Sequence, residues 1–227
     1  MTVANLAALR FPKRFVSLVL EKGSLLGALV CIAVAMAFST VGAYELANTV
    51  HVEDLVFGPT RSSVIDALIG AVGVERTTVL VYMLQRSFDA LVIASAITPI
   101  FLWLLGSSAM HAAARLRGAR GRAYLPMLIL FAYAELAYQV PTTVAGLLFG
   151  ASGPSLGPQI ANVIGIVMLV WFALVVYRGI CAHYGVAGER ALSIFFLGAI
   201  VFYLVPLVVI VGVLIGIVFA AALLQYF

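Results

Sequence analysis

A run of 25 residues without a charged side chain, 90–114, is followed at once by a stretch that holds four arginines and no acid. About 20 consecutive apolar residues are enough to cross the hydrocarbon core of a bilayer as a helix. Hydrophobic residues make up 64% of the chain and charged residues only 10%, whereas a soluble domain carries about 25% charge. The chain is therefore expected to fold in a membrane and not in water.

Apolar windows of membrane length recur along the chain, at 24–43, 88–110, 125–149, 159–177 and 193–217. They predict an all-α polytopic membrane protein, a five-transmembrane-helix bundle with short interfacial helices, which forms one membrane domain over 1–227. The last charge-free run, 191–227, is longer than a hydrocarbon core of about 30 Å requires. One tilted or kinked helix is expected there, and a break at Pro206 into two short spans is the alternative.

Basic residues alternate between the two sides of these spans. The N-terminal segment, the loop after the second span and the loop after the fourth span together hold ten Lys and Arg, while the other loops hold three. By the positive-inside rule, the N-terminus is expected in the cytoplasm and the C-terminus outside it.

Two segments outside the spans are expected to be ordered. The cytoplasmic lead-in, 1–23, has alternating apolar and basic residues typical of an amphipathic helix on the inner leaflet, with a break at Pro12. In the extracytoplasmic loop, 45–87, apolar residues recur at helical spacing from Val64 to Val72, and Ser63 is the predicted cap of that helix. This loop is too long for a simple connector. It is either a lid on the outer surface or a docking site for an extracytoplasmic partner.

Glu135 is the one acid well inside a predicted span, roughly 15 Å along the third helix. Tyr138 and Gln139 follow on the same helical face, and together the three form a candidate intramembrane polar site. A charged carboxylate is costly at this depth, so Glu135 is expected to be protonated or hydrogen-bonded within the bundle. The site is either a structural polar cluster or a proton or ligand site in a cavity.

The arginine-rich stretch between the second and third spans is the candidate cytoplasmic interaction loop, formed by His111, Arg115, Arg117, Arg120 and Arg122. Its arginines are suited to anionic lipid headgroups, and a charged protein partner is the alternative. Small residues spaced four apart predict close helix packing at Gly23, Gly27, Gly146, Gly150, Gly212 and Gly216. That packing lies either within the bundle or against another membrane protein.

The sequence offers little support for catalysis. The metalloprotease pattern HExxH and the P-loop pattern do not occur. His111 and His183 stand beside arginines without partners at metal-ligand spacing, so no metal site and no cofactor are expected. Proteins that bind nucleic acid cluster basic residues on a large water-exposed face. This chain has a net charge of +4 but is expected to expose little surface to water, which disfavours nucleic acid as a partner. We expect a protein that is not an enzyme.

Several residues carry a likeness to a known family. Before the first span, the sequence Phe11-Pro-Lys-Arg-Phe15 has a proline followed by an aromatic residue. The arginine loop has Gly106-x4-His111-x3-Arg115-Leu116-x-Gly118-x2-Gly121, and Tyr133-Ala134, Trp171, Gly179, His183 and Arg190-Ala191 follow. With these residues the chain resembles the Yip (Ypt-interacting protein) domain family, in particular its short prokaryotic members.

The resemblance has departures that limit what it implies. The usual double glycine is Gly118-Ala119 here, and the proline after Tyr133-Ala134 comes late, at Pro141. The long polar N-terminal region with which eukaryotic members engage small GTPases is missing, so that activity is not carried over. What the resemblance implies is a non-enzymatic partner or scaffold protein in the cytoplasmic (inner) membrane of a prokaryote.

Three functions remain open from the sequence, and an intramembrane enzyme has the least support of the three. The first is a membrane scaffold or accessory subunit of a transport or envelope complex, with other membrane or envelope proteins as partners, an ABC-type transport system among the candidates. The second is a small lipid or solute transporter subunit that uses Glu135 in the bundle core.

Overall fold

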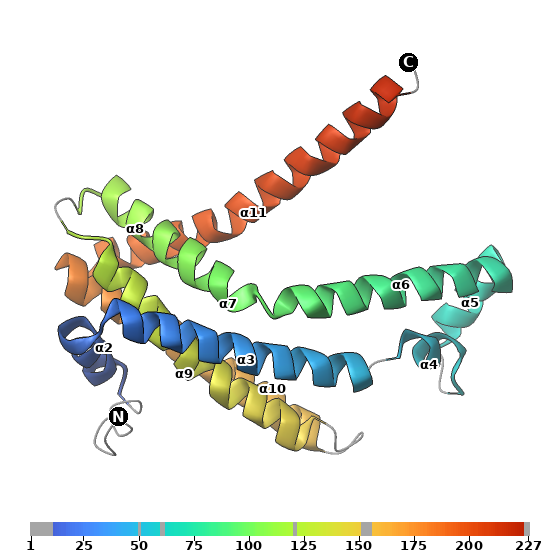
Figure 1. Ribbon diagram of the computed structural model, residues 1–227, viewed down its shortest axis with the longest axis horizontal. Helices are drawn as coiled ribbons and strands as arrows, with labels where there is room; N and C mark the ends of the chain where they lie inside the picture. The colour runs from blue at the N-terminus through green and yellow to red at the C-terminus, as the bar shows by residue number, and fades with distance from the viewer. Residues whose placement is uncertain (1–10, 50, 60–61, 120–121, 151–155, 225–227) are drawn as a thin grey trace. The chain divides into compact units, whose positions relative to one another are not determined.

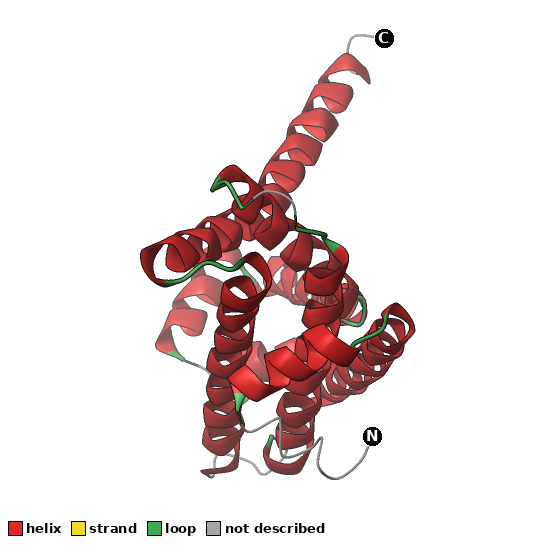
Figure 2. Cartoon of the chain, turned by 90° about the vertical axis from the view of Figure 1, so that its left-hand side faces the viewer, coloured by secondary structure: helices red, strands yellow, loops and turns green. Residues whose placement is uncertain are grey.

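The computed structural model describes residues 11–49, 51–59, 62–119, 122–150 and 156–224. These residues form helices and connecting turns, and no strand occurs among them (Figure 2). Five stretches are long and apolar enough to cross a membrane: Leu25–Phe57, Val74–Ser95, Leu125–Phe149, Leu156–Tyr184 and Gly188–Val208. The predicted class, an all-α polytopic membrane protein, is confirmed.

The elements follow one another along the chain as shown in Figure 1. In order they are α2 (Pro12–Lys22), α3 (Leu25–Thr49), α4 (Val52–Phe57), α5 (Ser63–Val72), α6 (Val74–Ser95), α7 (Thr98–Phe101), the π-helix η1 (Leu102–Gly106), α8 (Ser107–Leu116), α9 (Leu125–Phe149), α10 (Leu156–Tyr184) and α11 (Gly188–Leu224). The third predicted span, 125–149, has the same bounds as α9. The last predicted span lies within α11, which continues through Pro206 as one helix.

The chain divides into two compact units. The first unit comprises Met1–Cys31, Phe101–Glu135 and Val170–Phe227, and the second comprises Ile32–Ile100 and Leu136–Leu169. Each unit therefore combines segments that are distant in sequence.

The core of the first unit is formed by apolar side chains of α9, α10 and α11. Met127, Leu130, Ile180 and Ile194 are fully buried there. Between helices in lipid, van der Waals packing and not the hydrophobic effect provides most of the attraction, so close approach matters. Gly179 of α10 provides it, because a Cβ at that position would overlap the Leu130 side chain. In this unit α8 also packs against α11 (Figure 1).

Helix α2 begins at Pro12, whose missing N–H costs nothing in the first turn of a helix. Its apolar residues Phe15, Val16 and Val19 are buried. The Phe15 ring meets the Trp171 ring of α10 edge to face, with 5.1 Å between centroids. The apolar face of the predicted amphipathic lead-in is thus covered by protein, and residues 1–10 lie outside the described part.

In the second unit, α4 and α5 pack against α6. The predicted helix of the extracytoplasmic loop is present as α5, and the residue that precedes its first turn is Ser62, one position before the predicted cap Ser63. The loop predicted over 45–87 is therefore built largely of helix, including the last turn of α3 and the first half of α6.

The second predicted span, 88–110, is distributed over α6, α7, η1 and α8. The long apolar helix of this region is α6, which begins at Val74 and ends at Ser95. Pro99 explains the interruption, because it has no N–H to donate to the carbonyl of Ser95 four residues earlier. The Ser39 hydroxyl on α3 donates to that carbonyl instead, at 2.8 Å.

Candidate functional site

The arginine loop between α8 and α9 is held by hydrogen bonds to the end of α10 and the start of α11. Arg190 donates from Nη2 to the carbonyl oxygen of Arg117 at 2.7 Å. His183 donates from Nε2 to the carbonyl oxygen of Ala123 at 2.8 Å. These contacts lie within the first unit and fix the loop at both of its ends.

Glycine permits the turn that starts this loop. Gly118 has φ of +78°, a left-handed conformation that side chains other than glycine rarely adopt. The N–H of Ala119 donates to the carbonyl of Ala114 at 2.9 Å, and that of Gly118 donates to the carbonyl of Arg115 at 3.0 Å. This pair of bonds is the Schellman motif that ends helices, and it directs the chain away from α8.

His111 has a defined tautomer. Arg115 donates from Nε to Nε2 of His111 at 3.3 Å, so Nε2 is the accepting nitrogen. The proton is then on Nδ1, which donates to the Tyr184 hydroxyl at 2.7 Å. Burial lowers the pKa of His111 below its usual value, and the charges of Arg115 and His183 lower it further. Burial, the two neighbouring charges and the bond accepted at Nε2 all favour the neutral imidazole.

The guanidinium groups of Arg115, Arg117 and Arg122 are exposed, and we refer to these three residues as the arginine surface. Within the described ranges, none of the three forms an ion pair with a carboxylate. Arg120, the fourth predicted arginine of this loop, lies outside the described residues. These three arginines therefore present positive charge with no carboxylate paired to them among the described residues.

Glu135 is only 1% exposed and belongs to the first unit. Its Oε1 atom has no hydrogen-bond partner among the described residues. Tyr138 and Gln139 belong to the second unit, where Gln139 donates from Nε2 to Thr143 Oγ1 at 3.2 Å. Glu135 and the pair Tyr138 and Gln139 therefore belong to different units.

The second unit contains a pocket of about 450 Å³, lined by both apolar and polar side chains, that includes Tyr138 and Gln139 of the predicted polar site but not Glu135. We call it the interface pocket. Its lining comes from α3, α9 and the start of α10: Gly42, Glu45, Leu46, Tyr138, Gln139, Thr142, Thr143, Gly146, Leu147, Gly150, Pro158, Ala161 and Asn162. The signal in the sequence was weak, because each helix contributes only a few polar residues to it.

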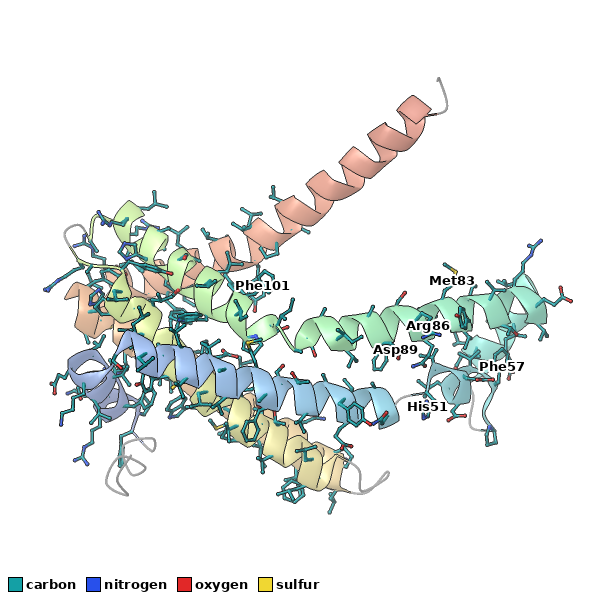
Figure 3. The ribbon with its side chains drawn as sticks, in the orientation of Figure 1. His51, Phe57, Met83, Arg86, Asp89 and Phe101 are labelled. Atoms are coloured by element: carbon teal, nitrogen blue, oxygen red, sulfur yellow. The ribbon has the colours of Figure 1, made fainter. Side chains whose placement is uncertain are left out.

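A second pocket of this unit, of about 500 Å³, lies where α4 adjoins α6, and Figure 3 labels His51, Phe57 and Asp89 among its residues. Gln85 connects its two sides: Oε1 accepts from the N–H of Val52 at 2.9 Å, and Nε2 donates to Asp89 at 3.0 Å. In the part of the chain that the structure describes, no group of three or more His, Cys, Asp or Glu is arranged to hold a metal ion.

The glycines predicted to pack helices fall into two sets. A Cβ at Gly23, the residue that ends α2, would overlap the Val19 carbonyl oxygen and lie 2.7 Å from Ile129 Cγ2 of α9. A Cβ at Gly27 would overlap the Tyr133 hydroxyl, so Gly27 permits close approach of α3 to α9 in the first unit. A Cβ at Gly146 or Gly212 would meet no atom within 4 Å, and one at Gly150 would meet only the backbone of its own helix. Gly216 lies in α11, and its surroundings are outside the described part.

Five helices that are long and apolar enough to cross a membrane define the class of the protein as a polytopic integral membrane protein. A model of the Yip1 domain family matches residues 6–210, nearly the whole chain, and the chain belongs to this family. The resemblance seen in the sequence is confirmed. Comparisons with curated proteins and with solved structures each gave no match.

Proposed function

We propose that this protein is a non-enzymatic scaffold or accessory subunit of a membrane transport or envelope complex. It lies in the cytoplasmic membrane of a prokaryote, with its N-terminus and its arginine loop in the cytoplasm and its C-terminus outside. Its partners are other membrane or envelope proteins, with an ABC-type transport system as one candidate.

The observation that carries this proposal is the preorganised arginine surface. Three hydrogen bonds, from His111, His183 and Arg190, hold the loop and its flanking helices, while its guanidinium groups are left exposed. A loop that is ordered before binding avoids the entropy cost of ordering on association. Exposed arginines give such a surface a preference for acidic partners, either an acidic protein segment or anionic headgroups.

A second observation supports a partner within the membrane. Gly212 of α11 has no neighbouring atom within 4 Å of a Cβ position. Tyr203 and Val208, on the same helix, are 73% and 60% exposed. A helix whose glycine faces no protein atom can be approached closely by a helix of another chain.

The test of the proposal replaces Arg115, Arg117 and Arg122 by Gln in the full-length protein. Copurification in mild detergent should lose a stoichiometric partner in this variant and keep it in the control Arg76→Gln, which removes an exposed arginine of the second unit. Flotation with vesicles that contain or lack anionic lipid separates headgroup binding from protein binding. Unchanged copurification and unchanged flotation would overturn the proposal.

The alternative function, a small lipid or solute transporter subunit, is favoured by one observation. The Glu135 carboxyl is buried to 1% exposure, and its Oε1 has no partner among the described residues. Purified protein in liposomes that moves a substrate without a partner, and loses this activity in both Glu135→Gln and Glu135→Leu, would support the transporter. Full function of both variants in cells would exclude it.

A further inference from the structure

The interface pocket gathers polar side chains from three largely apolar helices. Glu45 comes from α3, Tyr138 and Gln139 come from α9, and Asn162 comes from α10. Polar groups within spans are costly in lipid and occur mainly where they line a cavity or meet one another. Their convergence on one space points to a polar occupant.

The pocket lies at one end of the spans that form it. Its residues belong to the last turns of α3, the second half of α9 and the first turns of α10. At a rise of about 1.5 Å per residue, the lining of α9 from Tyr138 to Gly150 extends roughly 18 Å inward from the helix end. The pocket therefore opens near one end of α9 and α10 and extends along these membrane-length helices.

Glycine keeps the space open. Gly146 lines the pocket, and a Cβ added there would meet no atom within 4 Å. A Cβ added at Gly42 would lie 3.4 Å from Thr143 Cγ2, which is a normal van der Waals distance. A side chain at position 146 would consequently enter the pocket without disturbing the helices around it.

The charges select the chemistry of the occupant. Glu45 is the one charged residue among the lining residues, so the lining suits an ammonium group, while a phosphate attached to it would have to lie outside the pocket, in water. The other polar groups are the hydroxyls of Tyr138, Thr142 and Thr143 and the amides of Gln139 and Asn162. The Asn162 amide makes no hydrogen bond to any residue that the structure describes. Carboxylate and amide oxygens that accept hydrogen bonds suit an ammonium group with N–H donors.

Apolar side chains adjoin this polar lining. Leu46 and Leu147 line the pocket and are 49% and 38% exposed. These side chains offer an apolar surface beside the polar groups, on helices long and apolar enough to cross a membrane. We propose that the interface pocket binds a membrane lipid with a primary ammonium headgroup, with the ammonium near Glu45 and the acyl chains along Leu46 and Leu147. This goes beyond the proposed scaffold function and does not involve the arginine surface.

The test measures lipid retention by the full-length protein in detergent, using native mass spectrometry. Phosphatidylethanolamine should be retained about tenfold more than phosphatidylglycerol or phosphatidylcholine, because only its headgroup brings a positive charge with N–H donors. Gly146→Met, which fills the pocket, and Glu45→Gln, which removes the charge, should each abolish this preference.

The matched control is Gly165→Met on α10. Position 165 also has no atom within 4 Å of a Cβ, and it does not line the pocket. Lipid retention should be as in the wild type. Equal retention of the three lipids, or an unchanged preference in Gly146→Met, would overturn the proposal. Displacement of phosphatidylethanolamine by millimolar free ethanolamine would also overturn it, because the ligand would then be a soluble amine and not a lipid.

Discussion

The Ser39 hydroxyl on α3 donates a hydrogen bond to the carbonyl oxygen of Ser95 at the end of α6, with 2.8 Å between the two oxygens. Pro99 follows four residues after Ser95 and cannot supply the N–H that a continuous helix would provide. In lipid no water replaces a missing donor, so the serine both satisfies the carbonyl and connects the two helices. The break after α6 is thereby stabilised from a segment 56 residues away.

Replacing Ser39 by Ala should lower the free energy of unfolding by about 1 kcal/mol, because the Ser95 carbonyl loses its donor. Unfolding by SDS in mixed micelles, followed by circular dichroism, measures this change. Thr40→Val is the matched control, since Thr40 bonds only to the carbonyl of Met36 in its own helix. In a Pro99→Ala background, residue 99 regains an N–H and Ser39→Ala should cost less. An equal cost in both backgrounds would contradict the role assigned to Ser39.

Stability should depend on pH through His111. Its pKa is lowered in the folded protein, first by burial and then by Arg115 and His183, so the unfolded chain binds more protons below the usual value of 6.5. The contribution of His111 to the free energy of unfolding is therefore fully present above about pH 6.5. It decreases as the pH falls from there to the pKa of His111 in the folded protein, and it does not change further below that pKa. Protonation also removes the lone pair that accepts from Arg115.

Thermal unfolding in detergent between pH 8 and pH 5 checks this expectation. His111→Gln retains a polar side chain but cannot titrate, so its loss of stability at low pH should be smaller than that of the wild type. Parallel pH profiles for the two proteins would show that another group is responsible.

Gly118→Ala should destabilise the arginine loop by about 1 kcal/mol, because φ of +78° is unfavourable for a side chain. The added Cβ would also lie 3.2 Å from Nη2 of Arg190, the group that holds the carbonyl of Arg117. Gly118→Asn should cost less, since asparagine tolerates this conformation better. Limited proteolysis at the loop, with trypsin, reports the change as faster cleavage. Equal cleavage of the wild type and both variants would mean that the turn does not depend on glycine.

The sequence predicted the features that depend on composition and local pattern. Apolar windows identified the class and the bounds of α9, and the run of basic residues identified the arginine loop. The bonds from His111 to Tyr184 and from Arg190 to Arg117 each join residues 73 positions apart, and no local pattern encodes such a pairing.

The structure of the second predicted span and the existence of the interface pocket were harder to predict from the sequence, because both depend on contacts between distant residues. A hydropathy window measures only how apolar the residues are. It does not show that Pro99 leaves the Ser95 carbonyl without a donor from its own helix. The interface pocket depends on Glu45 and Asn162 lying beside α9, which is a property of tertiary packing. The sequence predicted a polar site at Glu135, the one acid well inside a span. In the structure, Tyr138 and Gln139 line a pocket together with residues of other helices.

Gly27→Ala should lower the free energy of unfolding by about 2 kcal/mol, because the added methyl group would overlap the Tyr133 hydroxyl and force the helices apart. Tyr133→Phe removes that hydroxyl, so the double variant Gly27→Ala, Tyr133→Phe should recover part of the loss relative to Tyr133→Phe alone. Gly165→Ala is the control for helix propensity, because its Cβ meets no atom within 4 Å, and it should leave stability unchanged or raise it slightly. SDS unfolding of the four variants measures these differences. A double variant as costly as the sum of its single changes would show that the Tyr133 hydroxyl does not limit the approach of α3 to α9 in the first unit.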